Sequence, residues 1–322
     1  MLETVIETER LTTSNASNAI NEPAASINAP ATIFKPSSAW LDRSKFTNAG
    51  SVFPYSVSIL SWGLNEEESI EEFLLRAKAM MDSFQVEYEH IFIDDGSTDG
   101  TFAIASRVQK IYPQLKIIKN ERNRGSGWNT RIAVAAATKD VLFWQTVDWC
   151  YDIKNIGRYL WSLRDHDVVQ GVRVEPNKPR YGWLFEKIPL LRDIRVTKRS
   201  DNFQKAVISL TNYLLVRILF QVPLLDFQNV TIYPRKLAQS IQFESASAFS
   251  NPEMLLKAYW KGARIGQVSI GFIARDKGVA KGTRLKVVLK SVSQVLGFWF
   301  KWVIRGKRPD KLVGSIDPEV IF

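Results

Sequence analysis

Carboxylates, amides and glycines gather where apolar segments of this chain end. Asn65-Glu66 follows the segment 57–61, Asp94-Asp95-Gly96 follows 91–93, and Asp148 follows 141–146. Each of these groups also makes an ordinary turn by itself. A carboxylate at a strand end accepts hydrogen bonds from a base or a ribose, and carboxylate oxygens are ligands for Mg²⁺ or Mn²⁺. Their joint occurrence predicts a ligand site.

Alternating strand and helix patterns position these residues. Helical spacing of apolar residues predicts helices at 70–84, 102–112 and 131–137, between strands at 57–61, 91–93, 115–118 and 141–146. The back half continues with a fifth strand at 167–171, a helix at 205–220, a strand at 230–233, a helix with Asn251 as N-cap and a strand at 265–272. This order predicts an α/β fold with a mostly parallel sheet flanked by helices. Ligands of such sheets bind beyond the carboxyl ends of the strands.

Composition restricts the metal. The 322 residues include one cysteine, Cys150, and two histidines, which excludes a disulfide framework, a cysteine-based zinc site and an iron–sulfur cluster. Any metal must be held mainly by oxygen, which indicates Mg²⁺ or Mn²⁺. We interpret Cys150 as a packing residue rather than a redox centre.

Charge is distributed unevenly along the chain. Residues 1–161 contain 16 basic and 20 acidic residues, whereas residues 162–322 contain 27 and 13. The basic back half fits an anion: nucleic acid, an anionic membrane surface or a phosphorylated substrate. No recognisable nucleic-acid-binding module is present, so we expect no nucleic acid partner.

The motifs of the front half resemble those of family 2 glycosyltransferases of the GT-A fold. They comprise Asn65-Glu66, the run from Asp94 to Thr101, Asn123-x-Gly125-x-Gly127-x-x-x-Arg131, and Asp148. The resemblance implies a Rossmann-like sheet that binds a nucleotide-diphospho-sugar. It implies that Asp94 or Asp95 contacts the base or ribose, and that Asp148 is the second aspartate of the metal-binding Asp-x-Asp. The expected donor-binding residues are Asn65, Glu66, Asp94, Asp95, Asn123, Gly125 and Arg131.

Two positions depart from the family pattern. Thr146 replaces the first aspartate of Asp-x-Asp, and Lys139 replaces the usual glycine before Asp140. The loss at Thr146 lowers the ligand charge, but the second aspartate and the diphosphate still hold the ion in the family. Asp152 is a substitute ligand or a surface helix cap.

The back half is similar to dolichol-phosphate mannose synthases and related polyprenyl-phosphate sugar transferases. Gly171-Val172-Arg173, Asp226 before a strand, and Arg275-x-x-Gly278-x-Ala280-Lys281 carry this likeness. It implies Asp148, Asp226 and Arg275 as catalytic residues. It also implies Arg173, Arg199 and Lys281 as ligands of the acceptor phosphate.

The expected reaction is therefore an inverting hexosyl transfer from a nucleotide-diphospho-sugar to polyprenyl phosphate. A phosphate is ionised near pH 7, so the transfer needs no strong base, and the sequence has no obvious histidine base. One alternative is a family 2 enzyme with a saccharide or other hydroxyl acceptor and Asp226 as general base. The other is an inactive nucleotide-sugar-binding homologue, since Thr146 and Ala280 depart from the motifs.

The two ends of the chain differ from the middle. Residues 1–39 contain a single aromatic residue, Phe34, and the sequence predicts a flexible tail over residues 1–54 without a signal peptide. Residues 55–282 are predicted to form the GT-A domain, and residues 283–322 an amphipathic membrane-interface segment. Residues 285–304 mix aromatic and aliphatic residues with cations, which suits a helix in the interface of an anionic membrane. The alternative is a terminal helix packed on the core. We expect a cytoplasmic protein, peripheral at the cytosolic face of a membrane.

Overall fold

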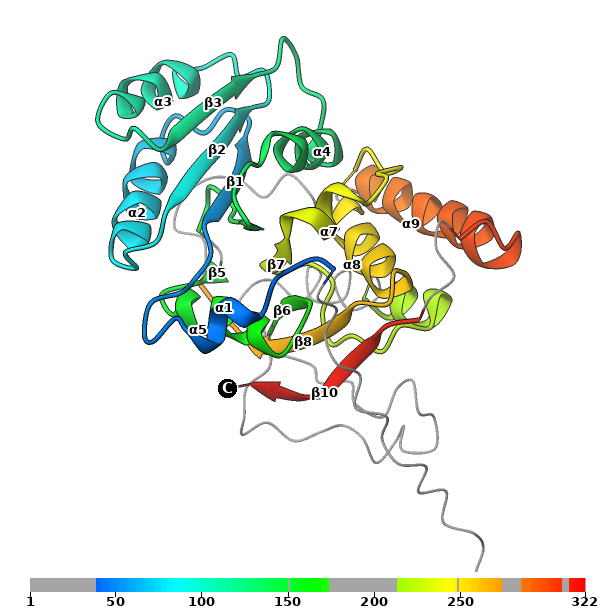
Figure 1. The fold of residues 1–322 in the computed structure, drawn as a ribbon. Helices are drawn as coiled ribbons and strands as arrows, with labels where there is room; N and C mark the ends of the chain where they lie inside the picture. The colour runs from blue at the N-terminus through cyan, green and yellow to red at the C-terminus, as the bar shows by residue number, and fades with distance from the viewer. Residues whose placement is uncertain are drawn as a thin grey trace, which may run out of the picture. The chain divides into compact units, whose positions relative to one another are not determined.

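The computed structural model places an eight-stranded sheet at the centre of the described residues (Figure 1). These residues are 39–149, 151–173, 213–247, 249–273, 285–308 and 313–321, and they belong to the unit Phe34–Phe322. The predicted site residues Arg199, Arg275 and Lys281 lie outside them, as does Cys150.

The sheet has the strand order β10-β8-β6-β7-β4-β1-β2-β3. Only β7 runs antiparallel to its neighbours, β4 and β6. The other seven strands are mutually parallel, which confirms the predicted mostly parallel α/β sheet. The strands are β1 (Val57–Gly63), β2 (Tyr88–Asp94), β3 (Leu115–Lys119), β4 (Val141–Trp144), β6 (Val168–Val172), β7 (Thr231–Pro234), β8 (Arg264–Ser269) and β10 (Ser315–Ile321).

Helices cover both faces of the sheet. Side chains alternate along β1, so Val57 and Ile59 join one apolar cluster and Leu60 joins the other. Figure 1 shows α2 and α3 on one side of β1–β3 and α4 on the other. The first cluster includes α2 (Ile70–Asp82), α3 (Thr101–Gln109) and α5 (Ile156–Trp161). The second includes α4 (Ser126–Ala136), α7 (Arg235–Gln239), α8 (Ser250–Trp260), α9 (Leu285–Trp299) and the π-helix η4 (Phe300–Ile304).

The core begins before the predicted domain boundary. Residues 41–53, which the sequence assigns to the tail, include α1 (Ser44–Thr47) and bury Leu41, Phe46 and Phe53 in the first cluster. The ring centroid of Phe46 lies 5.1 Å from that of Tyr55 and 5.7 Å from that of Trp161. Part of the segment before residue 55 is therefore ordered by aromatic packing.

Two local predictions were wrong. The strand predicted at 265–272 is divided: β8 ends at Ser269, and β9 (Gly271–Phe272) pairs with β5 (Tyr151–Asp152) in a separate two-stranded sheet. Asn251 is not the N-cap of α8, because the helix begins at Ser250 and the Phe249 carbonyl already accepts the Glu253 N–H at 2.9 Å.

Candidate active site

The loops that carry the predicted site residues meet at one edge of the sheet. The carboxyl ends of β1, β2, β3, β4 and β6 lie at the same edge because these strands are parallel. The antiparallel strand β7 begins at that edge. Residues from Asn65 to Asp226 are thus brought to one side of the fold.

The loops after β1 and β2 are joined by polar contacts. Asn65 has a φ of 54°, a left-handed conformation that asparagine tolerates. Its Oδ1 accepts the Thr98 N–H at 2.9 Å, and its own N–H donates to the Ser97 hydroxyl at 3.0 Å. The Glu66 N–H donates to the Thr101 hydroxyl at 2.8 Å. Both predicted donor residues therefore shape the site edge; their contacts with a donor remain a prediction.

Asp95 fastens the loop that follows β3. Its Oδ1 accepts the Asn120 side-chain amide at 2.9 Å and the Arg124 N–H at 2.8 Å, and its Oδ2 accepts the Gly125 N–H at 3.0 Å. The side chain is buried. Asp95 thus holds residues 120–125 in place; we call them the donor loop because the sequence predicts donor contacts at Asn123 and Gly125.

Asp94 retains an unused oxygen. Its Oδ1 accepts the Ser97 N–H at 3.1 Å, whereas its Oδ2 is buried and has no hydrogen-bond partner among the described residues. Next to it, Gly96 has a φ of 79°, and a Cβ there would lie 2.6 Å from the Arg122 carbonyl carbon. A buried acceptor without a partner is unusual. Asp94 is therefore better suited than Asp95 to accept a bond from a ligand.

The other predicted donor residues differ in their surroundings. Asn123 is exposed on the donor loop, and Gly125 adopts a φ of 86° at the start of α4. Arg131 is half-buried; its Nη2 donates to the Phe243 carbonyl at 2.8 Å, and its guanidinium lies 5.5 Å from the centre of the Trp128 ring. Arg131 thus joins α4 to the segment around Phe243, and its contact with a donor remains a prediction.

Asp148 lies on a tight turn after β4. The Trp149 N–H donates to the Thr146 carbonyl at 3.0 Å, and Trp149 has a φ of 47°. The Trp149 side chain is buried on α2, 5.8 Å from the Phe73 ring and 4.3 Å from the Arg76 guanidinium. This packing offsets the cost of the left-handed backbone and fixes the turn that presents Asp148.

Arg173 and Asp226 form an ion pair at the same edge. Arg173 Nε and Nη2 donate to the two carboxylate oxygens at 2.8 and 3.2 Å. Asp226 also accepts the N–H groups of Phe227 at 2.8 Å and Gln228 at 3.0 Å, and the side-chain amide of Asn229. A carboxylate has about four lone-pair sites, so these five bonds leave none for another proton donor.

The turn after β4 is tied to this ion pair through Tyr151. The Tyr151 hydroxyl donates to the Gln228 carbonyl at 2.6 Å, and the Gln145 amide donates to the Tyr151 carbonyl at 3.1 Å. The loops that carry Asp148 and Asp226 are therefore linked by a short path of hydrogen bonds.

Comparisons with known proteins agree with this geometry. Residues 63–220 match the family described as Glycosyl transferase family 2. The chain carries a family 2 glycosyltransferase domain. It is 25% identical over 263 residues to a dodecaprenyl-phosphate galacturonate synthase from Rhizobium johnstonii, which covers 78% of this chain and 68% of the relative.

Solved glycosyltransferase structures confirm the GT-A fold. Glucosyl-3-phosphoglycerate synthase from Mycobacterium tuberculosis, in complex with phosphoglyceric acid, matches with a TM-score of 0.52 and 17% identity over 80% of this chain and 81% of that one. Its complex with Mn²⁺, uridine diphosphate and glucosyl-3-phosphoglycerate matches with a TM-score of 0.51, 17% identity and the same coverage. The prediction of a glycosyltransferase is confirmed.

The oxygen ligands at and near Asp148 suit a hard divalent cation that is held mostly by the substrate. No group of three or more His, Cys, Asp or Glu side chains suited to a metal occurs in the part of the chain that the structure describes. Mg²⁺ usually binds one or two carboxylates together with substrate phosphates and water. Thr146 Oγ1 is buried without a hydrogen-bond partner among described residues, two positions before Asp148. One carboxylate and one hydroxyl on a fixed turn suit such an ion.

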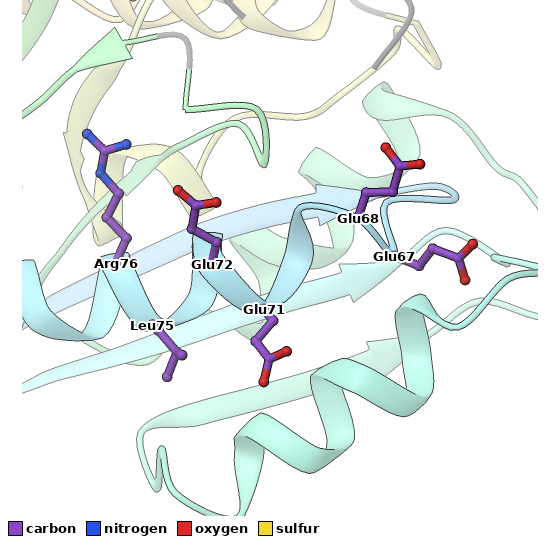
Figure 2. A pocket seen from close by; sticks show the side chains of 6 residues that line it. All are labelled: Glu67, Glu68, Glu71, Glu72, Leu75 and Arg76. Atoms are coloured by element: carbon purple, nitrogen blue, oxygen red, sulfur yellow. The ribbon is translucent and has the colours of Figure 1, made fainter. Parts of the chain in front are cut away.

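An acidic depression runs along α2 and is distinct from this edge in its chemistry (Figure 2). Glu71 in it pairs with Arg107 at 2.9 Å, and Glu67 accepts the Gly100 N–H at 2.8 Å. Its lining residues are Glu67, Glu68, Glu71, Glu72, Leu75 and Arg76. Four carboxylates repel a diphosphate, so we do not assign the donor to this depression.

Sequence reasoning missed two amides of the site. Asn120, directly after β3, donates to Asp95 and also to Asn129 Oδ1 at 2.8 Å. Asn129 is fully buried on α4, and its Nδ2 has no hydrogen-bond partner among the residues described. The position of Asn120 at a strand end was the available signal, whereas Asn129 lies inside a helix and gave none.

Proposed function

We propose that this glycosyltransferase moves a hexose from a nucleotide-diphospho-sugar to polyprenyl phosphate, with inversion at the anomeric carbon. The observation that carries the acceptor class is the state of Asp226. Its oxygens are occupied by five donors, two of them from Arg173, so it is a poor general base for a hydroxyl acceptor. A phosphate acceptor needs no such base.

Arg173 supplies the matching cation. Its guanidinium is about one-sixth exposed and is oriented by Asp226 at the edge where β6 ends. An oriented guanidinium binds a phosphate through charge-assisted hydrogen bonds and directs it towards the sugar. Arg199 and Lys281, outside the described residues, remain proposed phosphate ligands, and Arg275 a proposed catalytic residue.

The donor occupies the neighbouring loops in this proposal. Asp94 accepts a hydrogen bond from the base or ribose, and the donor loop borders the diphosphate. Asp148, with the Thr146 hydroxyl two positions earlier on the same turn, would hold Mg²⁺ or Mn²⁺, which when bound neutralises charge on the departing nucleoside diphosphate. An acceptor phosphate oxygen then bonds to the anomeric carbon while the bond from that carbon to the donor diphosphate breaks.

The C-terminal helix, formed by α9 and its continuation η4, supports a membrane-bound acceptor. Leu296, Phe300 and Ile304 are 42, 46 and 55% exposed and recur every four residues, so they form one apolar stripe. Arg305 beside the stripe is exposed, as is Lys301, whose ammonium pairs with Glu244. Exposed apolar residues flanked by cations are typical of a helix that lies in the interface of an anionic membrane. Among the described helices, none is long and apolar enough to cross a bilayer.

The opposite face of this helix belongs to the core. Trp302 is fully buried; its ring centroid lies 4.6 Å from that of Phe298 and 5.7 Å from that of Trp260. The alternative of a helix packed on the core therefore holds for this face, and the interface helix is our proposal for the exposed stripe. We therefore propose a peripheral enzyme at the cytosolic face of a membrane, with polyprenyl phosphate and the membrane surface as its partners.

A donor and acceptor panel tests the proposal. Purified protein with Mn²⁺ and each of several UDP- and GDP-sugars is given polyprenyl phosphate, phosphoglyceric acid or a neutral oligosaccharide, and the sugar-bearing product is detected by mass spectrometry. We expect transfer to polyprenyl phosphate with at least one donor. Transfer only to the oligosaccharide would support the hydroxyl-acceptor alternative. Transfer only to phosphoglyceric acid would indicate a soluble phosphorylated acceptor. The absence of both transfer and donor hydrolysis would indicate an inactive homologue.

Flotation with vesicles tests the membrane part separately. The triple variant Leu296→Ser, Phe300→Ser, Ile304→Ser should lose association with anionic vesicles while its thermal unfolding changes little. Ile111→Ser is the matched control, since Ile111 is 65% exposed elsewhere on the surface. Truncation of the helix is unsuitable because it removes buried Trp302. Equal flotation of the triple variant and the control would contradict the assignment.

A further inference from the structure

Residues 243–247, which we call the bridging segment, pack against the start of α4. A Cβ at Gly127 would lie 2.5 Å from the Ala246 carbonyl carbon and 2.6 Å from the Ser245 oxygen. A Cβ at Gly125 would lie 3.3 Å from the Ala246 oxygen. Only glycine allows this close approach without movement of the backbone. The position of the bridging segment therefore limits the positions open to Gly125 and Gly127.

The same segment is connected to Asp95 through Gly125. The Gly125 N–H donates to Asp95 Oδ2 at 3.0 Å, and Arg131 on α4 donates to the Phe243 carbonyl at 2.8 Å. The donor loop is thus held on one side by Asp95 and on the other by the bridging segment.

Glu244 connects the bridging segment to the C-terminal helix. Its Oε1 accepts the Trp302 Nε1–H at 3.1 Å and a bond from Lys257 Nζ at 3.1 Å. Its Oε2 accepts a bond from Lys301 Nζ. Burial opposes ionisation of Glu244, but the Lys301 and Lys257 ammonium groups outweigh it and hold the carboxyl pKa below its usual range. Glu244 is therefore a carboxylate with three donors from two helices.

The innermost residues of this network, Lys257 and Glu253, are buried. Lys257 is 1% exposed, lies 2.6 Å from Glu253 Oε1 and sits 4.8 Å from the centre of the Trp302 ring. Glu253 accepts the Glu244 N–H at 2.7 Å and the Ser245 N–H at 2.9 Å. Both the backbone and the side chain of Glu244 are thus fixed by α8, and its carboxylate compensates the buried Lys257 cation together with Glu253.

We propose that Glu244 is a positioning residue for the donor loop, which it holds through the bridging segment against Gly125 and Gly127. The inference rests on the proposed function only in assigning that loop to the nucleotide-sugar. Glu244 belongs to no motif that the sequence singled out, and it acts without contact with substrate. Its removal should loosen donor binding rather than the chemical step.

Glu244→Gln is the decisive variant, because it keeps the volume of the side chain and removes the charge. An amide group then faces Lys257 or Lys301, so the bridging segment loses part of its anchorage. We expect the Kd for a nucleoside diphosphate with Mn²⁺ to rise roughly tenfold, in the range reported for couplings through a packed network. The donor KM should rise in parallel, with kcat within about twofold.

Calorimetric titration measures this. The probe is UDP or GDP with Mn²⁺, whichever binds the unmodified protein more tightly. Glu71→Gln is the matched control, because Glu71 forms an exposed ion pair with Arg107 at 2.9 Å on another helix. Lys301→Met removes one hydrogen-bond partner of Glu244. Because Lys301 is about half exposed, this variant should remain folded and should raise the Kd less than Glu244→Gln does.

The outcomes separate the inference from the proposed function. A raised Kd in Glu244→Gln and Lys301→Met, with Glu71→Gln unchanged, supports it. Unchanged Kd in both variants, even with a lowered melting temperature, would show a purely structural network and overturn the inference while leaving the proposed function intact. If the unmodified protein binds neither nucleotide, the donor assignment fails, and the inference fails with it.

Discussion

Glu89 is a buried carboxylate whose charge should contribute measurably to folding. It is 2% exposed on β2. Its Oε1 accepts the Ser58 hydroxyl at 2.6 Å and the Thr138 N–H at 2.7 Å, and its Oε2 accepts Lys116 Nζ at 2.7 Å and the Thr138 hydroxyl at 2.9 Å. Burial alone would raise the pKa of Glu89, but these bonds from Lys116, Ser58 and Thr138 outweigh it and lower the pKa to about 2.

The size of the effect follows from this shift. An unfolded glutamate titrates at about 4.3. The difference of a little over two units corresponds to about 3 kcal/mol of stability. Because the folded pKa is the lower one, the contribution is complete above about pH 5 and is lost as the pH falls towards about 2, with about half remaining near pH 3.

Glu89→Gln should therefore lower the free energy of unfolding by about 3 kcal/mol at pH 7 and by about half as much near pH 3. Urea unfolding followed by circular dichroism at several pH values measures both differences. Glu87→Gln is the control, since Glu87 is 75% exposed in its ion pair with Lys139, and it should stay within about 1 kcal/mol. A cost below about 1 kcal/mol for Glu89→Gln, or one that does not change with pH, would show that the charge of Glu89 does not stabilise the fold.

The remaining predictions concern the site. Asp94→Asn should raise the donor KM several-fold without lowering the melting temperature. Asp95→Asn should raise the donor KM and also lower the melting temperature, because Asp95 holds the donor loop. Steady-state kinetics and thermal unfolding measure both quantities, and an equal donor KM in the unmodified protein and the two variants would show that the pair only shapes the turn. Asp226→Asn should impair binding of the acceptor phosphate through Arg173 without removing a base, so the acidic limb of the pH–rate profile should persist; loss of that limb would restore Asp226 as the base. Thr146→Asp should be tolerated and lower the Mn²⁺ concentration needed for half-maximal activity, and a large loss of activity at saturating Mn²⁺ would contradict this.

Strand and helix positions in the front half were readable because apolar periodicity is strong there. The predicted strand at 57–61 and helix at 70–84 correspond to β1 (Val57–Gly63) and α2 (Ile70–Asp82). The direction of β7 was not readable, because the side-chain pattern of a strand does not specify its orientation. The strand β10 was missed because Asp317 and Pro318 interrupt it at the edge of the sheet, where a proline is tolerated.

The sequence predicted which loops lie together at the edge of the sheet, but not which of their side chains hydrogen-bond to one another. The motif that contains Asp94 and Asp95 was correctly placed at the end of a strand. The backbone N–H groups of Arg124 and Gly125 donate hydrogen bonds to the Asp95 carboxylate from a loop that is distant in sequence, and no residue pattern predicts these bonds. The pairing of Arg173 with Asp226 likewise depends on the antiparallel entry of β7 beside β6.

Glu244 illustrates the limit of motif reasoning. Its partners Lys257 and Trp302 lie in two helices separated by a long stretch of sequence, and none of the three belongs to a recognisable signature. Burial of an ammonium group required compensating carboxylates, and only the packed structure shows which ones provide them.

The metal dependence of donor turnover in Asp148→Asn tests the proposed role of Asp148 as the ligand of the divalent ion. Release of nucleoside diphosphate is measured against Mn²⁺ concentration for the unmodified protein, for Asp148→Asn, and for Asp152→Asn as the neighbouring carboxylate control. We expect a loss of roughly 10²-fold or more in Asp148→Asn that added Mn²⁺ does not restore, and near-normal turnover in Asp152→Asn. Near-normal activity of Asp148→Asn at saturating Mn²⁺, or a comparable loss in Asp152→Asn alone, would contradict it.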